Sequence, residues 1–344
     1  MQAVAAEDER RHNPGPEQLW GESWYFDFSA PDGSLGGYVR LGLYPNLGVA
    51  WYWAALVGRG RRLVMVRDHE LQPPRGRDLE VRGDGIWSAV NCETPLDHWS
   101  IGLEAFAVAL DDPFEAYRSE RGDRIGLGFD LEWEATASAA GLRPGWYGQP
   151  CRVSGEILVA DEQLAFDGTG YRSHRWGVDD WWGGGSHYRA SGVLDDGTHF
   201  AIATADRDIG GNIGGDIGGN SGGNSGGDIG GDGNGRATMG YVSGPGHDGV
   251  VDEVGIANSS TPAALELAPG LATMLGQADL PAAATLMLGA FSLVATVLAP
   301  APLRLEGPDG RSARLARSWC RYQAGDGRGG VGWAEWLHPQ TEPI

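Results

Sequence analysis

Short Asp-Gly turns recur along the chain, and each one separates two runs of residues with strand-like character. These turns are Asp32-Gly33, Asp84-Gly85, Asp195-Asp196-Gly197, Pro308-Asp309-Gly310 and Asp326-Gly327. Asp-Gly readily adopts the positive φ angles that tight β-hairpins require. The regular spacing of the turns therefore predicts many short antiparallel strands, arranged as sandwiches or barrels rather than as alternating strands and helices.

The runs between the turns alternate as half-buried strands do. Residues 129–134 strictly interleave apolar and acidic side chains, which places one face on a core and the other in water. Residues 49–57 are apolar on both faces and include Trp51 and Trp53. Such a run predicts a central strand or one wall of a ligand cavity, so both tryptophans are candidate ligand-binding residues.

Helical signals are sparse. Asp112 and Pro113 have the pattern of an N-cap followed by proline at the first helical position, which predicts one short helix from Pro113 to about Arg118. We therefore expect an all-β protein with few short helices.

The chain is long enough for two domains, and a linker-like stretch at residues 139–145 marks the boundary between them. We expect an N-terminal domain over residues 19–145 and a C-terminal domain over residues 149–340. Residues 1–18 are polar and contain proline, which predicts a disordered N-terminal tail.

A Gly-rich repeat of Asp-Ile-Gly-Gly and Asn-Ser-Gly-Gly units occupies residues 208–235. Such polar sequence buries too little surface to offset chain entropy, which predicts a disordered loop inserted in the second domain. A calcium-binding β-roll is the alternative, but its unit has about nine residues, whereas the period here is four.

Charge and cysteine usage exclude several classes of protein. The formal net charge is −20 and all 26 basic residues are arginine, so a nucleic-acid partner is not expected. Cys92, Cys151 and Cys320 are far apart and lack metal-binding spacing, which favours free thiols in a reducing compartment. The N-terminus has no apolar stretch of a signal peptide, so we expect a cytoplasmic location.

One uncharged run, residues 282–299, approaches the length of a membrane span. It is rich in alanine, carries several hydroxyl side chains and is bracketed by Pro281 and Pro300. These features favour a strand or short helix buried against a core, and we expect no stable membrane insertion.

Titratable and aromatic side chains are densest in residues 166–182. His174 and Trp176 lie two positions apart there, so an extended backbone points both side chains the same way. An imidazole beside an indole can place a proton donor next to an aromatic face that stabilises a cation. The alternative, which composition alone favours, is that His174 caps a turn and the tryptophans seal the bottom of a barrel.

Carboxylates also occur within apolar strands, and Glu104 and Glu335 are the clearest cases. A carboxyl desolvated in an apolar cavity has a raised pKa and can act as a general acid, so both are candidate catalytic residues. The alternative is a structural acid paired with an arginine such as Arg40, Arg172 or Arg175.

No nucleophile elbow, phosphate-binding loop, HExxH motif or dinucleotide-binding fingerprint stands in the context that it requires. Hydrolase, kinase and dehydrogenase functions are therefore disfavoured, and we expect neither a cofactor nor a metal.

Residues 166–181 read Phe-Asp-Gly-x-Gly-x-Arg-x-His-x-Trp-Gly-x-x-Asp-Trp. This pattern resembles the central signature of the carotenoid 1,2-hydratase (hydroxyneurosporene synthase) and AttH-like superfamily, and most of all its actinobacterial branch. Residues 26–28, 36–46 and 332–336 fit the same branch. The resemblance covers the chain from about Trp20 to Trp336, apart from the Gly-rich insert and the Ala-rich run.

The resemblance implies two tandem lipocalin-like (calycin-type) β-barrel or sandwich domains that hold an apolar ligand. Members of the superfamily hydrate isoprenoid double bonds, catalyse pericyclic cyclisation or carry lipids. By motif match, His174 and Trp176 fall on the His-x-Trp pair implicated in the hydratases, where an acid protonates an alkene and aromatic side chains hold the cation. The accompanying Tyr-x-Asp of a later strand has no counterpart around residues 198–206.

The sequence also departs from its branch, which usually reads Arg-Asp-His-Ser-Trp-Gly-x-Arg-Asp-Trp. Ser173 replaces the first Asp, Arg175 replaces Ser, and Asp179 replaces the second Arg. The loss of Asp beside His174 removes an orienting partner for the imidazole. These changes suit a diverged binding protein.

We therefore expect a protein that binds an isoprenoid, steroid or polyketide-like lipid in an enclosed β-barrel cavity. Whether it also hydrates or cyclises that ligand stays open. A hydro-lyase or cyclase would use His174 to relay the proton. Trp176 and Trp181 would stabilise positive charge, and Glu104 or Glu335 would supply the acid. The further ligand-binding candidates are Arg172, Asp180 and Trp333.

Two other functions remain. The first is a lipid carrier without chemistry. The second is a carbohydrate-binding β-sandwich, which 14 tryptophans favour. A carbohydrate-binding protein would show its tryptophans in an open row, whereas a lipid-binding protein would enclose them.

Overall fold

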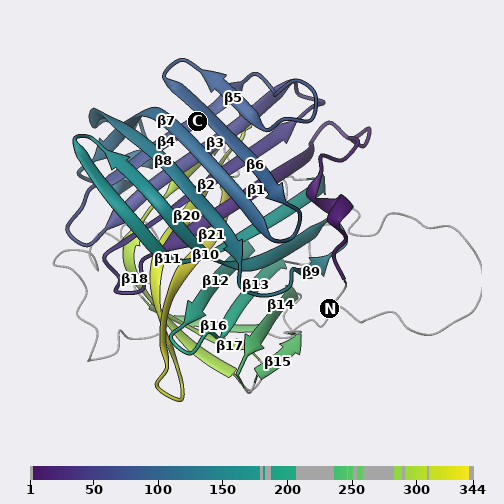
Figure 1. Ribbon diagram of the computed structural model, residues 1–344, viewed down its shortest axis with the longest axis vertical. Coiled ribbons are helices and arrows are strands. Elements are labelled where there is room, and N and C mark those ends of the chain that lie inside the picture. Colours follow the sequence, from purple (N-terminus) through teal and green to yellow (C-terminus); the bar gives the residue numbers. More distant parts are fainter. Residues whose placement is uncertain are drawn as a thin grey trace, which may run out of the picture.

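The computed structural model of the protein describes residues 3–178, 181–182, 187–206, 236–245, 247–250, 254–258, 283–288, 291–307 and 310–340. These residues form two antiparallel β-sheets, one above the other in Figure 1. Within the described chain the helical elements are two short 3₁₀-helices, η1 (Ala6–Glu9) and η2 (Pro113–Tyr117). The protein is all-β and lipocalin-like, as predicted.

The first sheet has 11 strands, and eight of them close into a barrel. The strand order is β4-β3-β2-β1-β11-β10-β8-β7-β6-β5, with β9 beside β10, and β4 also pairs with β7 to complete the ring. The strands are β1 (Trp20–Ser29), β2 (Leu35–Tyr44), β3 (Val49–Gly58), β4 (Leu63–Leu71), β5 (Glu80–Gly83), β6 (Ile86–Thr94), β7 (His98–Leu110), β8 (Asp123–Ala135), β9 (Ala140–Arg143), β10 (Trp146–Val159) and β11 (Glu162–Val178).

The second sheet has ten strands in the order β15-β14-β13-β12-β21-β20-β18-β17-β16, with β19 beside β20. The strands are β12 (His187–Leu194), β13 (His199–Asp206), β14 (Arg236–Gly244), β15 (His247–Val250), β16 (Val254–Asn258), β17 (Ala283–Leu288), β18 (Phe291–Pro300), β19 (Leu303–Glu306), β20 (Ser312–Ala324) and β21 (Gly329–Gln340). Its central strands β12, β20 and β21 lie against the outside of the barrel.

The turns predicted from Asp-Gly are hairpin turns in the structure. Their glycines have φ angles between 70° and 96°, which only glycine adopts without strain. The turns connect β1 to β2, β5 to β6, β12 to β13, β19 to β20, and β20 to β21. Asp309, in the fourth turn, lies outside the described residues.

The barrel interior is a packed apolar core. In β8, Phe129, Leu131 and Trp133 are buried while the acidic residues between them are exposed, which confirms the predicted alternation. Aromatic rings from β1, including Phe26 and Phe28, pack against Trp133 edge-on. Because side chains fill this interior, the space for a ligand has to be sought elsewhere.

Strand β3 is buried on both faces, as its sequence predicted. Tyr52 and Leu56 belong to the barrel core. Trp51 and Trp53 point outward into a second apolar cluster, where they are joined by Leu315 and other side chains of the second sheet. The outer face of the barrel is therefore apolar because the second sheet covers it.

The sheets divide between Val178 and His187, so residues 146–178 pair within the first sheet rather than the second. The predicted domain division at residues 145–149 thus does not coincide with the division between the sheets. Residues 3–18, predicted as a disordered tail, instead lie along the first sheet: η1 is formed there and Glu9 is buried.

The described residues of the apolar run at residues 282–299 belong to strands β17 and β18, one of the two predicted outcomes. Among the described residues, no helix has the length and apolar character needed to cross a bilayer. The Gly-rich repeat at residues 208–235 lies outside the described residues.

Strand β7 provides a matched test of the packed barrel. Leu103 is buried in the core, with 1% of its surface exposed, whereas Phe106 on the same strand is 70% exposed. We expect Leu103→Ala to lower the free energy of unfolding by about 2–5 kcal/mol, because it leaves a cavity. Phe106→Ala should change it by less than about 1 kcal/mol. Urea denaturation of both variants measures this, and equal losses would contradict the packing described here.

Candidate functional site

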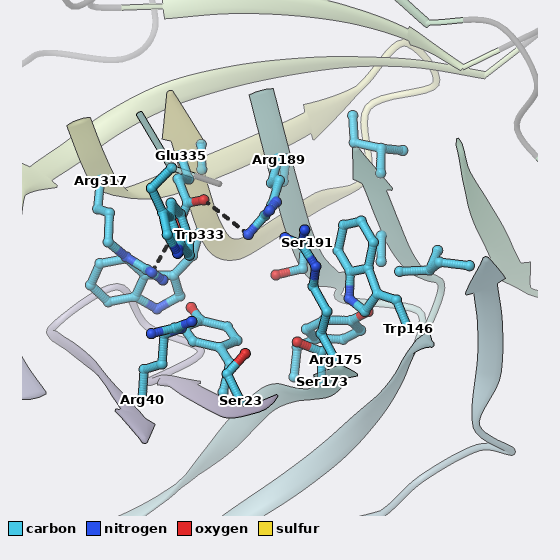
Figure 2. Close-up of a pocket in the computed structure, with 18 residues that line it drawn as sticks. Ser23, Arg40, Trp146, Ser173, Arg175, Arg189, Ser191, Arg317, Trp333 and Glu335 are labelled. Atoms are coloured by element: carbon cyan, nitrogen blue, oxygen red, sulfur yellow. Dashed lines mark hydrogen bonds and ion pairs between the residues drawn. The ribbon is translucent and has the colours of Figure 1, made fainter. Parts of the chain in front are cut away.

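A pocket lies between the barrel and the second sheet, with a cavity volume of about 70 Å³. Figure 2 shows side chains from both sheets converging on it. Its walls combine aromatic rings, arginine side chains and small hydroxyls. The lining residues with polar or aromatic side chains are Ser23, Tyr25, Arg40, Trp146, Tyr171, Ser173, Arg175, Trp181, Arg189, Ser191, Arg317, Trp333 and Glu335.

The alternation of β1 and β11 decides which side chains reach the pocket. Ser23 and Tyr25 of β1, and Ser173 and Arg175 of β11, line it, whereas the residues between them face the barrel. The two strands approach closely at Gly170, where an added Cβ would lie 2.2 Å from the carbonyl oxygen of Asp27. Glycine is therefore required at this position of the sequence signature.

Guanidinium groups lie over the aromatic rings of the pocket. The Arg189 guanidinium lies 5.0 Å from the ring centroid of Trp146 and 5.4 Å from that of Trp181. Arg40 lies 5.1 Å from the Trp181 ring, and Arg317 lies 4.6 Å from the Tyr25 ring. Cation–π contacts of this kind help to hold the arginine side chains in place.

Glu335 is an ionised carboxylate that accepts hydrogen bonds in a buried charge network, and it does not have the properties of a proton donor. Its carboxylate lies 2.9 Å from Arg317, 3.4 Å from Arg189 and 3.1 Å from His187 Nε2. Burial alone raises the pKa of Glu335, but the two arginines and the hydrogen bond from His187 outweigh it and hold the pKa well below its usual range. The predicted role of Glu335 as proton donor is therefore not supported.

Asp27 is the carboxyl group of this site that burial keeps partly protonated near neutrality. It lies behind Tyr25 and Ser191, at the junction of the two sheets. It accepts hydrogen bonds from the Tyr171 backbone N–H (2.9 Å), the Tyr25 hydroxyl (3.0 Å) and the Ser191 hydroxyl (3.3 Å). Burial raises the pKa of Asp27 to about 7, and these hydrogen bonds and Arg317 only partly offset the effect.

His174 and Trp176 do point the same way, as predicted, but away from the pocket. His174 is buried on the barrel side of β11, where Nε2 lies 2.9 Å from Glu22 and Nδ1 lies 2.8 Å from the carbonyl oxygen of Asp8. Trp176 stacks on His12 at 3.8 Å. The His-x-Trp pair thus joins the N-terminal segment to the barrel and does not line the space where a ligand would bind.

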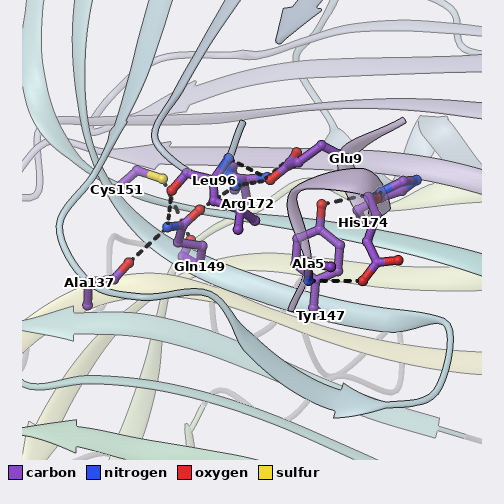
Figure 3. Close-up of polar contacts among 10 residues, drawn as sticks. Ala5, Glu9, Leu96, Ala137, Tyr147, Gln149, Cys151, Arg172 and His174 are labelled. Atoms are coloured by element: carbon purple, nitrogen blue, oxygen red, sulfur yellow. Dashed lines mark hydrogen bonds and ion pairs between the residues drawn. The ribbon is translucent and has the colours of Figure 1, made fainter. Parts of the chain in front are cut away.

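Arg172, predicted to bind ligand, also faces the barrel. Figure 3 shows it between Glu9 and Gln149, and its guanidinium lies 2.6 Å from Glu9. Gln149 in turn donates to the carbonyl oxygens of Leu96 and Ala137. This buried network fixes the N-terminal segment to β10 and β11, so the role of Arg172 is structural.

The other site residues predicted from the sequence also lie partly inside and partly outside the pocket. Trp181 and Trp333 line the pocket. Trp51 and Trp53 are buried in the apolar cluster between the sheets without lining it. Glu104 is exposed on the outer face of β7 because the inward positions of that strand are the odd ones, so it does not lie in an apolar cavity as predicted. Asp180 lies outside the described residues.

The sequence pattern did not identify Asp27, Tyr25 and Ser191 as site residues. The signal available was Asp27 itself, an acidic residue between Phe26 and Phe28. The predicted cavity inside a barrel is likewise corrected: the pocket lies between the sheets.

One group of described residues has the composition of a metal site. His12, Glu22 and His174 present two imidazole nitrogens and a carboxylate oxygen that lie within 4.8 Å of one another. They lie on the barrel side of β1 and β11, not in the pocket.

Comparisons with known proteins agree with this architecture. A family described as "Domain of unknown function (DUF7064)" matches residues 5–218. No curated protein matches the chain. An AttH-like protein of Nitrosomonas europaea has a similar structure, with a TM-score of 0.59 at 13% identity over 97% of each chain.

Two further solved structures are similar. Kievitone hydratase of Nectria haematococca has a TM-score of 0.54 at 12% identity, over 94% of this chain and 90% of its own. CghA in complex with Sch210972 has a TM-score of 0.52 at 10% identity, over 93% of this chain and 88% of its own. At these identities the similarity establishes a shared fold.

Proposed function

We propose that this chain, a member of the family of the domain of unknown function DUF7064, binds a small, mainly apolar molecule between its two sheets. We also propose that it protonates this molecule without a cofactor. The observation that carries the proposal is Asp27, a buried carboxyl with a raised pKa that two pocket hydroxyls join to the ligand space. We assign the chain to the carotenoid 1,2-hydratase and AttH-like superfamily and to its actinobacterial branch.

The lining favours a ring-containing ligand that carries oxygen atoms over a bare hydrocarbon. Trp146, Trp181 and Trp333 offer flat apolar surface. Each lining arginine has five N–H donors, so it can bind a protein acceptor and a ligand oxygen at the same time. A polyketide-like or phenolic molecule with carbonyl or hydroxyl groups fits this combination better than a carotenoid does.

The proposed chemistry is a proton transfer through Tyr25. When Asp27 is protonated, its O–H donates to the Tyr25 phenol oxygen, and the phenol O–H is then free to turn toward the ligand. As the phenol proton passes to an alkene carbon of the ligand, the Asp27 proton passes to the phenol oxygen, which leaves a ligand cation and an Asp27 carboxylate. Water or a second alkene of the ligand then captures the cation. The proton released in the capture step returns to the Asp27 carboxylate.

The kinds of protein that share the fold support the proposal of small-molecule binding and proton transfer. The names of two solved structures refer to a hydratase and to a protein in complex with a small molecule. The tryptophans also argue against the carbohydrate-binding alternative, because none of the 14 is exposed as an open row would require. A lipid carrier without chemistry remains the second candidate, and it is favoured by the placement of His174 on the far side of β11.

The proposed setting is the cytoplasm, with a small molecule as partner and without nucleic acid or membrane insertion. Three free cysteines support a reducing compartment. The net charge of −20 disfavours polyanionic partners.

Occupation of the pocket can be tested without knowing the natural ligand. Ser173 lines the pocket, so Ser173→Trp should fill it, whereas Glu104→Trp adds the same side chain on the exposed face of β7. We expect the fluorescent aromatic anion 1-anilinonaphthalene-8-sulfonate to bind the unmodified protein. Its affinity should fall at least tenfold in Ser173→Trp and remain unchanged in Glu104→Trp. Equal binding by both variants would place the dye outside the pocket.

The proton donor is tested with the molecule that co-purifies with the protein, identified by native mass spectrometry and extraction. We expect Asp27→Asn to reduce kcat by roughly 10²–10⁴-fold, because the amide supplies no proton, while the dissociation constant of the ligand changes little. Since the acid form is required, kcat of the unmodified protein should fall as the pH rises through about 7. Glu104→Gln is the control with unchanged kcat.

Turnover by Asp27→Asn at the unmodified rate would remove Asp27 as the acid. Binding of the molecule with no turnover by the unmodified protein would identify a carrier instead.

A further inference from the structure

Three side chains converge on the face of β1 and β11 that is turned away from the pocket. Glu22 Oε1 lies 2.7 Å from His12 Nδ1 and 2.9 Å from His174 Nε2. Glu22 and His174 are fully buried, while the side chain of His12 is 24% exposed. Residues from the N-terminal segment, β1 and β11 thus meet at one point.

The hydrogen bonds of His174 leave one of its nitrogens facing a carboxylate. Nδ1 lies 2.8 Å from the carbonyl oxygen of Asp8, which can only accept, and 3.3 Å from the Tyr147 hydroxyl, which can donate or accept; the shorter contact favours a hydrogen on Nδ1. Nε2 then faces Glu22 Oε1, which is also an acceptor. With Nδ1 protonated, this contact needs a proton on Nε2, a proton on the Glu22 carboxyl group, or a cation between the two atoms.

The surroundings have the form that proteins give to metal ligands. A metal-binding histidine commonly donates its other ring N–H to a backbone carbonyl, as His174 does to Asp8. The carboxylate of Glu22 is oriented by the backbone N–H of His12, which lies 3.0 Å from both of its oxygens. A second imidazole nitrogen, Nδ1 of His12, reaches the same carboxylate oxygen.

Aromatic rings hold both imidazoles in position. Trp24 stacks on His174 with ring centroids 4.5 Å apart and an angle of 21° between the planes. Trp176 stacks on His12 with centroids 3.8 Å apart and an angle of 12°. The His-x-Trp segment therefore provides one ligand and the support for another.

We propose that His12 Nδ1, Glu22 and His174 Nε2 bind one divalent first-row transition metal ion, for which zinc is the natural probe. Two imidazole nitrogens and one carboxylate suit such ions and leave a position for water. Ligands that each lie about 2.1 Å from a tetrahedral ion stand roughly 3.4 Å apart, so the observed separations of 2.7 Å and 2.9 Å have to widen by about 0.5–0.7 Å when an ion enters.

The ion would fasten the N-terminal segment to the barrel. Its ligands are far apart in the sequence, at positions 12, 22 and 174, and nearby Glu9 is already paired with buried Arg172. Loss of the metal should therefore loosen the segment without emptying the pocket on the other face. The proposal is independent of the ligand and chemistry proposed above.

The test is zinc binding by the full-length protein after treatment with a chelator, measured by titration calorimetry and by the absorption of a cobalt(II) derivative. We expect one ion per chain. His12→Gln should weaken zinc binding at least tenfold and is expected to fold, because His12 is partly exposed. His98→Gln, on β7 beside Glu132, is the matched control with unchanged affinity.

Absence of zinc binding, or equal affinity in His12→Gln and the unmodified protein, would overturn the proposal. A second proton on the ring in place of the ion would appear in nitrogen-15 NMR as a His174 ring protonated on both nitrogens even with excess zinc present. That result would also overturn it.

Discussion

The alternation of side chains along β1 and β11 is the constraint on which the site depends. These two strands form a shared wall, so successive residues face the barrel core and the second sheet in turn. Phe26 faces the core, while Tyr25 and Asp27 face the second sheet. A shift of one residue in register would exchange the two sets and destroy both the core and the pocket. The close approach of the strands at Gly170 holds this register.

Local patterns made the fold predictable, whereas the site depended on contacts that a sequence does not display. The Asp-Gly turns and the alternation in residues 129–134 are short-range signals, and both were confirmed. The pattern also predicted that His174 and Trp176 share a direction, but not which face of the barrel wall they occupy. The partner of Arg172 is Glu9, 163 residues away in a segment whose composition predicted disorder.

The sequence departs from the pattern of the branch that it resembles mainly at positions on the pocket side of the wall formed by β1 and β11. Ser173 and Arg175 line the pocket, whereas Arg172 and His174, which keep the pattern, hold the N-terminal segment on the other side. The retained residues thus maintain the architecture, and the altered ones change the surface that a ligand would meet. This division fits the proposal of a ligand with more oxygen atoms than an isoprenoid.

The account depends most directly on the protonation state of Asp27. Carbon-13 NMR of the protein labelled at aspartate side chains, with Asp27→Asn used to assign the signal, follows this carboxyl as the pH is changed. Because burial between the sheets disfavours the charged form, we predict a titration near pH 7. A titration midpoint near 4, the value of an aspartate in water, would contradict the proposal that Asp27 is the proton donor of the pocket.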